Sequence, residues 1–273
     1  MAESVGPSGA CWSRVSSDIV FASGWFQVRR DRALRPDGST AEGAAPAMTE
    51  VLELRQYTLR PGRRDALIDL FDREFVETQE AAGMAVLGQF RDLRDPDRFV
   101  WLRGFADMPS RAAALNRFYG GPVWAAHRDA ANATMIDSDD VLLLRPVGDG
   151  FPLPAARGTE LPQSRFLAGL HFADAPFDKV PEPEVPPLAA FTTAQEENTF
   201  PALPIREGEH AYVWFARFDD QATLGAYVSG ADPAATLLEL APTARSLLRW
   251  MLALTGGGTP PRDCPRAVRT YGF

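Results

Sequence analysis

The chain has little cysteine and little histidine for its 273 residues, and both shortages argue against familiar kinds of site. Its two cysteines, Cys11 and Cys264, form no CxxC pair, so free thiols are favoured over a disulfide between the two ends. The three histidines, His127, His171 and His210, form no HxH or HxxxH pair and have no acidic residue at metal-ligand spacing. We therefore expect neither a metal nor any other cofactor.

Long apolar runs and basic patches are also missing. No run of about 18 apolar residues is present, which argues against a transmembrane helix, and the N-terminus lacks a basic segment followed by an apolar one. The net charge is −8, and Lys179 is the only lysine. Nucleic acid and anionic membranes are poor partners for such a chain. We predict a cytoplasmic protein, and its arginine-rich, alanine-rich composition resembles that of high-GC bacterial genomes.

Motifs that would name a reaction are absent too. The chain contains neither GxxxxGK[ST] nor GxSxG. The glycine run 256–258 precedes Thr259-Pro260-Pro261 and no helix, so it is not a dinucleotide-binding fingerprint. The sequence leaves open whether the protein is an enzyme.

What the chain does contain is a strand-turn-helix phrase that occurs twice. Residues 100–107, VWLRGFAD, reappear 113 positions later as residues 213–220, VWFARFDD. The same offset places Leu54 of one strand-like run on Leu167 of another. One common offset predicts two copies of a module of roughly a hundred residues.

The first module is predicted over residues 48–147. Strand-like patterns cover 51–59, 86–93, 98–105 and 141–144. A helix begins after the turn at Pro61 and ends at 82–83, and a second is capped by Ser110, with helical character resuming at 124–132. The order β-α-β-β-α-β is that of a ferredoxin-like unit.

The second module is predicted as a degenerate copy over residues 163–258, after a Gly- and Pro-rich linker at 148–162. Strands are expected at 166–172, 188–195 and 211–218, and helical segments at 221–229 and 234–240. The prolines of 173–187 predict a shortened or missing first helix. Residues 246–254 close the module as either strand or helix.

The two ends of the chain differ from these modules. Residues 1–47 are rich in Ser, Gly, Ala and Arg, with a short hairpin suggested by 19–21 and 25–28. This segment is either a poorly ordered arm or an over-extension upstream of a true start at Met48. Residues 259–273 are predicted to form a C-terminal tail.

The run Leu52-Glu53-Leu54-Arg55-Gln56-Tyr57-Thr58-Leu59-Arg60-Pro61-Gly62 resembles the opening signature of NIPSNAP domains. Residues 100–105 with Arg111 resemble the third strand and following helix of that family, and 120–124 resemble its short DPxW-like phrase without the acid. The resemblance covers about 49–146. It implies a dimeric α+β barrel, here intramolecular, whose fold is α+β with two ferredoxin-like units. Small cofactor-free monooxygenases resemble this architecture, but the family implies no agreed reaction.

Glu53, Arg55 and Tyr57 alternate on the first predicted strand and would face the barrel interior if Leu52 and Leu54 face the helices. Such a row can bind a polar or anionic small molecule, because arginine forks onto carboxylates and tyrosine donates from an apolar wall. The alternative is that Arg55 pairs with Glu53 and that Tyr57 fills the barrel.

A tryptophan recurs on the third strand of each module. Trp101 with Arg103 could stack an aromatic ligand, while Trp214 is followed by Ala216 in the second copy, so the two half-sites are not equivalent. The alternative is a purely structural role, in which both tryptophans are core residues. His171 is a candidate general base, as Tyr57 is a candidate proton donor.

Three functions are compatible with these patterns. The first is binding of a small, partly aromatic or anionic molecule in a sheet-lined barrel cavity. The second is cofactor-independent oxygenation of aromatic or polyketide-like substrates, and the third is a structural or interaction module with a filled barrel. A cavity of about 300 Å³ or more favours the first two. The chain is expected to be a monomeric pseudo-dimer or a higher homo-oligomer, with a small molecule as its one expected partner.

Overall fold

The computed structural model describes residues 4–5, 11–22, 27–34, 40–44, 49–153, 157–230 and 235–249. The chain divides into two compact units, one made of residues 1–48 with 254–273 and the other of Thr49–Ala253. The predicted tail 259–273 and Cys264 lie outside the described residues. Within the described part, no helix is both long enough and apolar enough to span a bilayer.

The smaller unit contains a four-stranded antiparallel sheet in the order β1-β2-β3-β4. Its strands are β1 (Ser4–Val5), β2 (Cys11–Ala22), β3 (Gln27–Leu34) and β4 (Thr40–Ala44). β2 and β3 pair as a hairpin in which Ile19 lies opposite Arg29 and Phe21 opposite Val28, in the region where the sequence suggested one. The limits predicted for the domains, and the two origins considered for 1–47, stay predictions.

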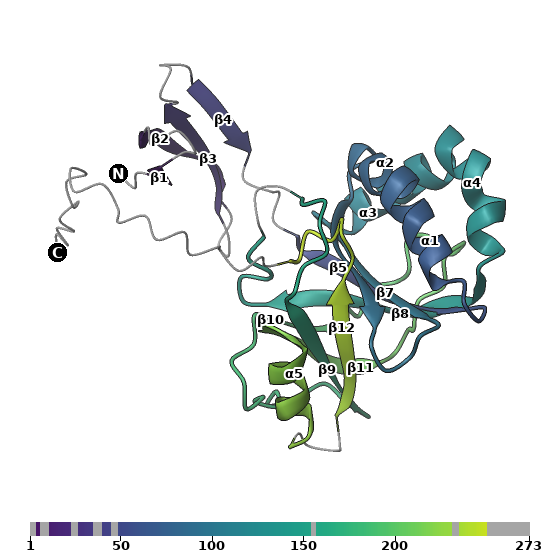
Figure 1. The fold of residues 1–273 in the computed structure, drawn as a ribbon. Coiled ribbons are helices and arrows are strands. Elements are labelled where there is room, and N and C mark those ends of the chain that lie inside the picture. The colour runs from purple at the N-terminus through teal and green to yellow at the C-terminus, as the bar shows by residue number, and fades with distance from the viewer. Residues whose placement is uncertain are drawn as a thin grey trace. The chain divides into compact units, whose positions relative to one another are not determined.

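The larger unit is a closed eight-stranded antiparallel barrel with the strand order β10-β11-β9-β12-β6-β7-β5-β8 (Figure 1). Two four-stranded sheets of identical topology build it. In each, the first strand lies between the fourth and the third, and the third pairs with the second. The sheets join along two seams, β8 with β10 and β6 with β12. The predicted pair of ferredoxin-like units sharing one barrel is confirmed.

The first half of the barrel has the complete β-α-β-β-α-β order. Its strands are β5 (Val51–Leu59), β6 (Ala85–Asp92), β7 (Arg98–Phe105) and β8 (Met135–Val147). Its helices are α1 (Arg64–Leu70), the π-helical segment η1 (Phe71–Phe75), α2 (Val76–Ala81), α3 (Met108–Tyr119) and α4 (Pro122–Asn132). The helix cap predicted at Ser110 lies three residues earlier, because the Asp107 side chain accepts the Ser110 backbone N–H at 2.6 Å.

The described residues of the second half form four strands and one helix. Its elements are β9 (Arg165–Ala173), β10 (Ala189–Thr193), β11 (His210–Phe218), α5 (Gln221–Val228) and β12 (Thr236–Pro242). No helix connects β9 to β10 within the described residues 174–188, as the prolines predicted. Phe177, Val180 and Val185 of this segment pack on the sheet where the first half has a helix.

The fourth strand of the second half is a correction. Residues 234–240 were expected to be helical and 246–254 to close the module, but Thr236–Pro242 is the closing strand and the described residues 246–249 form neither strand nor helix. Leucine, alanine and glutamate favour helices locally, whereas pairing with β9 on one side and β6 on the other completes the barrel. Tertiary pairing overrides the local preference.

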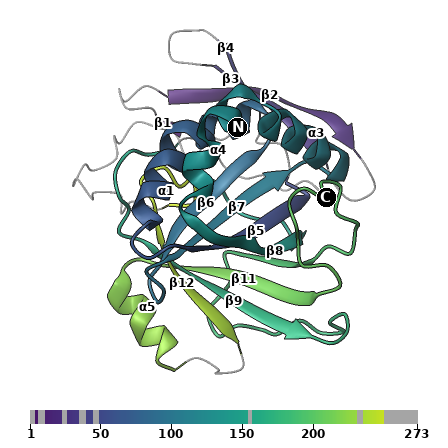
Figure 2. The same ribbon diagram turned by 90° about the vertical axis from the view of Figure 1, so that its right-hand side faces the viewer.

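The barrel interior is packed with apolar side chains from all eight strands, and it includes Leu54, Phe90, Phe166, Phe191 and Phe215. The strands present aliphatic and phenylalanine side chains at alternate positions, so both sheets bury one face against the other. The helices lie on the opposite face of each sheet, which we call the outer face (Figure 2). α1 to α4 cover the first half and α5 the second. A packed interior is the feature expected of the third candidate function, a structural or interaction module with a filled barrel.

Strand register corrects the sequence alignment of the two halves. Trp101 lies opposite Arg55, whereas Trp214 lies opposite Gly169. The first strands therefore correspond at an offset of 114 positions, one more than the third strands. Leu54 is an interior residue, but Leu167 lies on the outer face of the second half, so the two leucines are not equivalent.

A half-buried carboxylate lies between the halves. Asp72 of η1 accepts a hydrogen bond of 3.5 Å from Thr243, which follows β12. Burial raises the pKa of the Asp72 carboxyl to about 6, against smaller opposing effects of Thr243 and Arg245. A carboxyl whose pKa is raised on folding stabilises the native state while protonated, below its unfolded pKa, and loses that contribution as the pH rises through about 6.

We expect Asp72→Asn to stabilise the protein at about pH 8 by about 1 kcal/mol, after discounting for partial exposure, and to have little effect near pH 4. Thermal unfolding of both proteins at the two pH values measures this. Asp65→Asn is the matched control, because the Asp65 side chain is 74% exposed. A loss of stability at pH 8 in Asp72→Asn would contradict the assignment.

Candidate functional site

The polar row of β5 lies on the outer face, beneath the helices, and not in the barrel interior. Leu52 and Leu54 belong to the interior cluster, whereas Tyr57 and Trp101 belong to the cluster that packs against α1 to α4. The predicted orientation was wrong because both faces of this sheet are buried. Alternation shows that two faces exist but gives no sign of which one meets the second sheet.

Glu53 receives three arginines at full burial. Both Arg55 Nη1 and Arg103 Nε donate to Glu53 Oε2 at 2.7 Å, and Arg111 Nε donates to Oε1 at 2.7 Å. All four side chains are 0% exposed. The four residues, which we call the arginine cluster, carry three positive charges and one negative charge.

The electrostatics of the cluster hold Glu53 ionised. Burial raises the pKa of the Glu53 carboxyl, but Arg103, Arg55 and Arg111 together outweigh it and bring the pKa well below its usual range. Burial lowers the pKa of Arg55, but Tyr57 and Glu53 reverse this and raise it above its ordinary value. With Glu53 ionised and the three arginines protonated, the cluster has a net charge of +2 on side chains that are 0% exposed.

The outer ends of the arginines are only partly satisfied. Arg103 Nη1 donates to Gln79 Oε1 at 3.3 Å and to the Tyr119 hydroxyl at 3.4 Å. Arg111 Nη1 donates to Asn198 Oδ1 at 3.0 Å and Thr199 Oγ1 at 3.1 Å. The buried Nη2 atoms of Arg103 and Arg111 find no hydrogen-bond partner among the described residues. Buried donors without acceptors are costly, so two charged donors here lack the acceptor that their burial requires.

A pocket of about 330 Å³ adjoins the cluster. It lies between the outer face of the first half and the segment that connects β10 to β11, and it is lined by Tyr57, Tyr119, Trp124, Asn132, Met135, Ser138, Phe200, Ala202 and Leu203. Three of these residues are direct partners of the cluster: Tyr57, Tyr119 and Ser138. The pocket and the arginines therefore share a wall.

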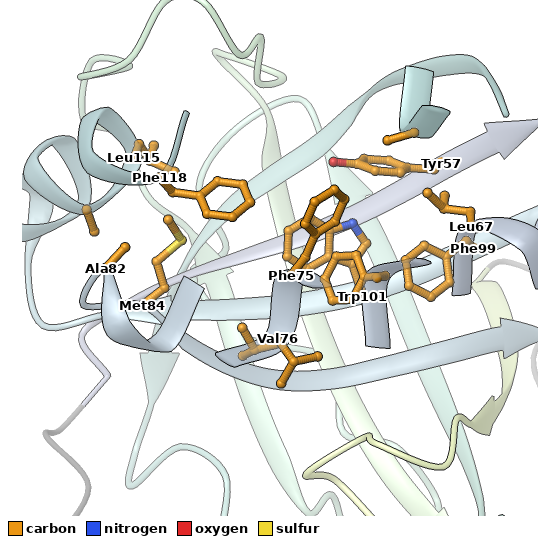
Figure 3. Packing of buried hydrophobic residues seen from close by; sticks show 14 of the residues in the cluster. Tyr57, Leu67, Phe75, Val76, Ala82, Met84, Phe99, Trp101, Leu115 and Phe118 are labelled. Carbon is orange, nitrogen blue, oxygen red and sulfur yellow. The ribbon is translucent and has the colours of Figure 1, made fainter. Parts of the chain in front are cut away.

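A smaller chamber of about 30 Å³ opens from the same tyrosines and is otherwise mainly aromatic. Phe71 and Phe75 of the π-helical segment η1 line it together with Trp101, and Figure 3 shows Phe75 beside Trp101. The buried Trp101 Nε1 has no hydrogen-bond partner among the described residues. π-Helical turns occur often at functional sites, and this one brings Phe71 within 4.8 Å of the Trp101 ring, between centroids.

The hydroxyl oxygens of Tyr57 and Tyr119 each accept a hydrogen bond from an arginine of the cluster. Arg55 Nε donates to the Tyr57 oxygen at 3.0 Å, and Arg103 Nη1 donates to the Tyr119 oxygen. Each phenol therefore accepts from an arginine, and its own proton is available to a further acceptor. Burial raises the pKa of the Tyr57 hydroxyl, with Arg55 opposing, which keeps it a neutral donor.

Residues 52–149 match the NIPSNAP family model. The first half of this barrel is a NIPSNAP domain. The match includes the whole arginine cluster, the two pocket tyrosines and Trp124. No curated protein matches the chain.

Solved structures resemble parts of the chain. A NIPSNAP family protein from Agrobacterium tumefaciens is 20% identical over 37% of this chain and 88% of its own, with a TM-score of 0.34. A NIPSNAP-like domain protein from Burkholderia xenovorans is 25% identical over 39% and 93%, with a TM-score of 0.36. A candidate monooxygenase from Fusobacterium nucleatum is 9% identical over 75% and 98%, with a TM-score of 0.44.

The second half offers an internal comparison for the NIPSNAP site. By strand register and helix position, Glu53, Arg55, Arg103 and Arg111 correspond to Leu167, Gly169, Ala216 and Leu224. The corresponding helices α3 and α5 even share an aspartate cap, Asp107 and Asp220. The same sheet face therefore folds with apolar residues at the four corresponding positions, and the fold does not itself require the charges of the NIPSNAP domain.

The candidate residues of the second half do not join this site. His171 corresponds to Tyr57 by register and lies on the outer face of its own sheet, where its Nε2 accepts from Trp214 Nε1 at 3.2 Å. It does not lie in the barrel interior, because the interior positions of β9 belong to Phe166, Ala168 and Leu170. The structure brings together Glu53, Arg55, Tyr57, Trp101 and Arg103, and separates His171 and Trp214 from them.

Sequence reasoning missed several contributors. Arg111 occupies the buried stripe of α3 beside Ala114 and Leu115. An arginine at an apolar position of an amphipathic helix is a readable signal of a buried charge. Tyr119, Trp124 and Phe200 gave no such signal, since their meeting depends on the segment between β10 and β11 reaching the NIPSNAP half.

Proposed function

We propose that the NIPSNAP half binds a small organic anion with an aromatic or apolar body in the pocket on its outer face. The observation that carries the proposal is the net charge of +2 in the buried arginine cluster, with two Nη2 donors that lack an acceptor among the described residues. An anion in the adjoining pocket supplies the compensating charge, next to Tyr57, Tyr119 and Ser138, which contact both the pocket and the cluster.

The pocket supports an aromatic or apolar ligand body. Tyr119, Trp124 and Phe200 form a continuous wall, with centroids 4.9 Å apart for Tyr119 and Trp124 and 5.7 Å apart for Tyr119 and Phe200. The pocket of about 330 Å³ has the size of a small-molecule site. The proposed site therefore lies on the outer face of the first sheet and not in the packed barrel interior.

The experiment is a calorimetric titration with 2-naphthoate and with its neutral isostere 2-naphthamide. We expect the carboxylate to bind about tenfold more tightly or better, which corresponds to about 1.4 kcal/mol, because only the anion compensates the cluster. Trp124→Ala should weaken binding of 2-naphthoate about tenfold by removing one wall of the pocket.

The matched control is Phe172→Ala, since Phe172 is an aromatic residue of the second half that is 41% exposed. This variant should bind 2-naphthoate as the wild type does. Equal affinity for the carboxylate and the amide would show that the site does not recognise charge, and the proposal would fail.

A further inference from the structure

The two pocket tyrosines point to a more specific ligand chemistry. Resting on the proposed function, we infer that the site binds a hydroxylated aromatic molecule as its oxyanion, with the ligand oxygen between the Tyr57 and Tyr119 hydroxyls. On binding, the O–H bond of the ligand breaks, its electron pair stays on the ligand oxygen, and the proton passes to solvent.

The direction of the arginine–tyrosine hydrogen bonds determines what the two hydroxyls can offer a ligand. A guanidinium has donors only, so Arg55 and Arg103 oblige the two phenol oxygens to accept. Each hydroxyl proton is then left for an acceptor on the pocket side. Tyr57 and Tyr119 both line the pocket and the inner chamber, so the two O–H donors serve one shared space.

The positive charge of the cluster favours an ionised ligand oxygen. A ligand oxygen in the pocket cannot enter the packed layer around Glu53. It interacts with the cluster's net charge of +2 through the two neutral tyrosine hydroxyls, which accept hydrogen bonds from the arginines. Preorganised donors in a site of low dielectric stabilise a localised oxyanion most strongly, because they need no reorganisation when the charge forms. A ligand oxygen that ionises gains more from this arrangement than one that stays neutral.

The surrounding titratable groups do not cancel this field. Asp137 and Asp139 flank Ser138 on β8 and are exposed, and His127 of α4 faces Glu74 at 3.6 Å, at the partly exposed edge of the helical layer. Glu53 has both oxygens occupied by arginines. No other carboxylate bonds to the cluster among the described residues.

The probe is 4-nitrophenol, whose phenolate has its own visible absorption band. Titrated across pH with the full-length protein in excess, bound 4-nitrophenol should ionise with a midpoint about one pH unit or more below that of the free compound, which is a tenfold or greater preference for the phenolate. Tyr57→Phe and Tyr119→Phe should each return the midpoint toward the free value. Tyr212→Phe, a buried tyrosine of the second half, should leave it unchanged.

The remaining outcomes are also decisive. Binding of 4-nitrophenol without a shifted midpoint, or a shift that survives in both pocket variants, overturns the inference. Binding of 2-naphthoate but not of 4-nitrophenol overturns it as well and leaves the proposed function standing. If neither probe binds, both fall. If Tyr57→Phe does not fold, as judged by thermal unfolding, Tyr119→Phe decides alone.

Discussion

Glu53→Gln is expected to lower the free energy of unfolding by about 3–5 kcal/mol, because it leaves three fully buried arginines without a counter-charge. The wild-type carboxylate accepts three hydrogen bonds of 2.7 Å, all from charged donors. A neutral amide keeps the shape of the side chain but supplies no negative charge, and its NH₂ group turns a donor toward arginine donors.

Urea unfolding followed by tryptophan fluorescence measures this loss, since Trp101 lies against Arg55 and Arg103. Glu209→Gln is the matched control. Glu209 also pairs with an arginine, Arg206, but both side chains are about one-third exposed, so the loss should stay under about 1 kcal/mol. A similarly small effect for Glu53→Gln would mean that the buried charges are compensated in some other way.

Replacing the whole arginine cluster is expected to cost little or no stability, in contrast to the replacement of Glu53 alone. The fourfold variant Glu53→Leu, Arg55→Met, Arg103→Met, Arg111→Leu should be as stable as the wild type within about 2 kcal/mol, or more stable, because a buried ionic network exchanged for apolar side chains of similar volume loses its desolvation cost as well. The second half already shows this face of the fold with apolar residues at the four corresponding positions.

The same variant should lose its preference for 2-naphthoate over 2-naphthamide entirely. Calorimetric titration and urea unfolding on one preparation separate the two effects. A variant that fails to fold would favour the structural reading of the cluster, in which the charges serve the NIPSNAP fold. A folded variant that still prefers the carboxylate would place the anion site elsewhere.

Together these two experiments distinguish stability from function. Deleting one member of a buried network measures the cost of leaving its partners unpaired, and not the worth of the network. Only the complete replacement shows whether the chain retains the charges for the fold or for a ligand. The second half of the barrel guides this replacement, because it has the same strand topology with apolar residues at the four corresponding positions.

The sequence could predict the order of the elements but not the face on which the site lies. Residues 51–59 and 98–105 alternate clearly, and the strands β5 and β7 have those bounds. Alternation, however, has the same period for both faces, and both are buried in this sheet. Placing Glu53, Arg55 and Tyr57 in the interior was wrong for that reason.

A constant sequence offset between the two halves identified corresponding residues only where the segments between them have the same length in both halves. Trp101 and Trp214, and Asp107 and Asp220, correspond at 113 positions, since strand and helix follow each other directly. Leu54 and Leu167 do not correspond, because one residue of difference between the first and third strands moves a side chain to the other face. Only the pairing of the strands reveals such a shift.

By itself, the sequence determined a repeated strand-turn-helix unit, a proline-rich replacement for one helix and a NIPSNAP-like first half, because these depend on local pattern and composition. The tertiary structure alone decided that β12 closes the barrel, that the interior is apolar, and that Arg111 and the segment between β10 and β11 complete a pocket around Tyr57 and Tyr119. The physical reason is that these features arise from contacts between residues far apart in the chain. A local pattern carries the propensity of a segment but not the identity of the partner against which it packs.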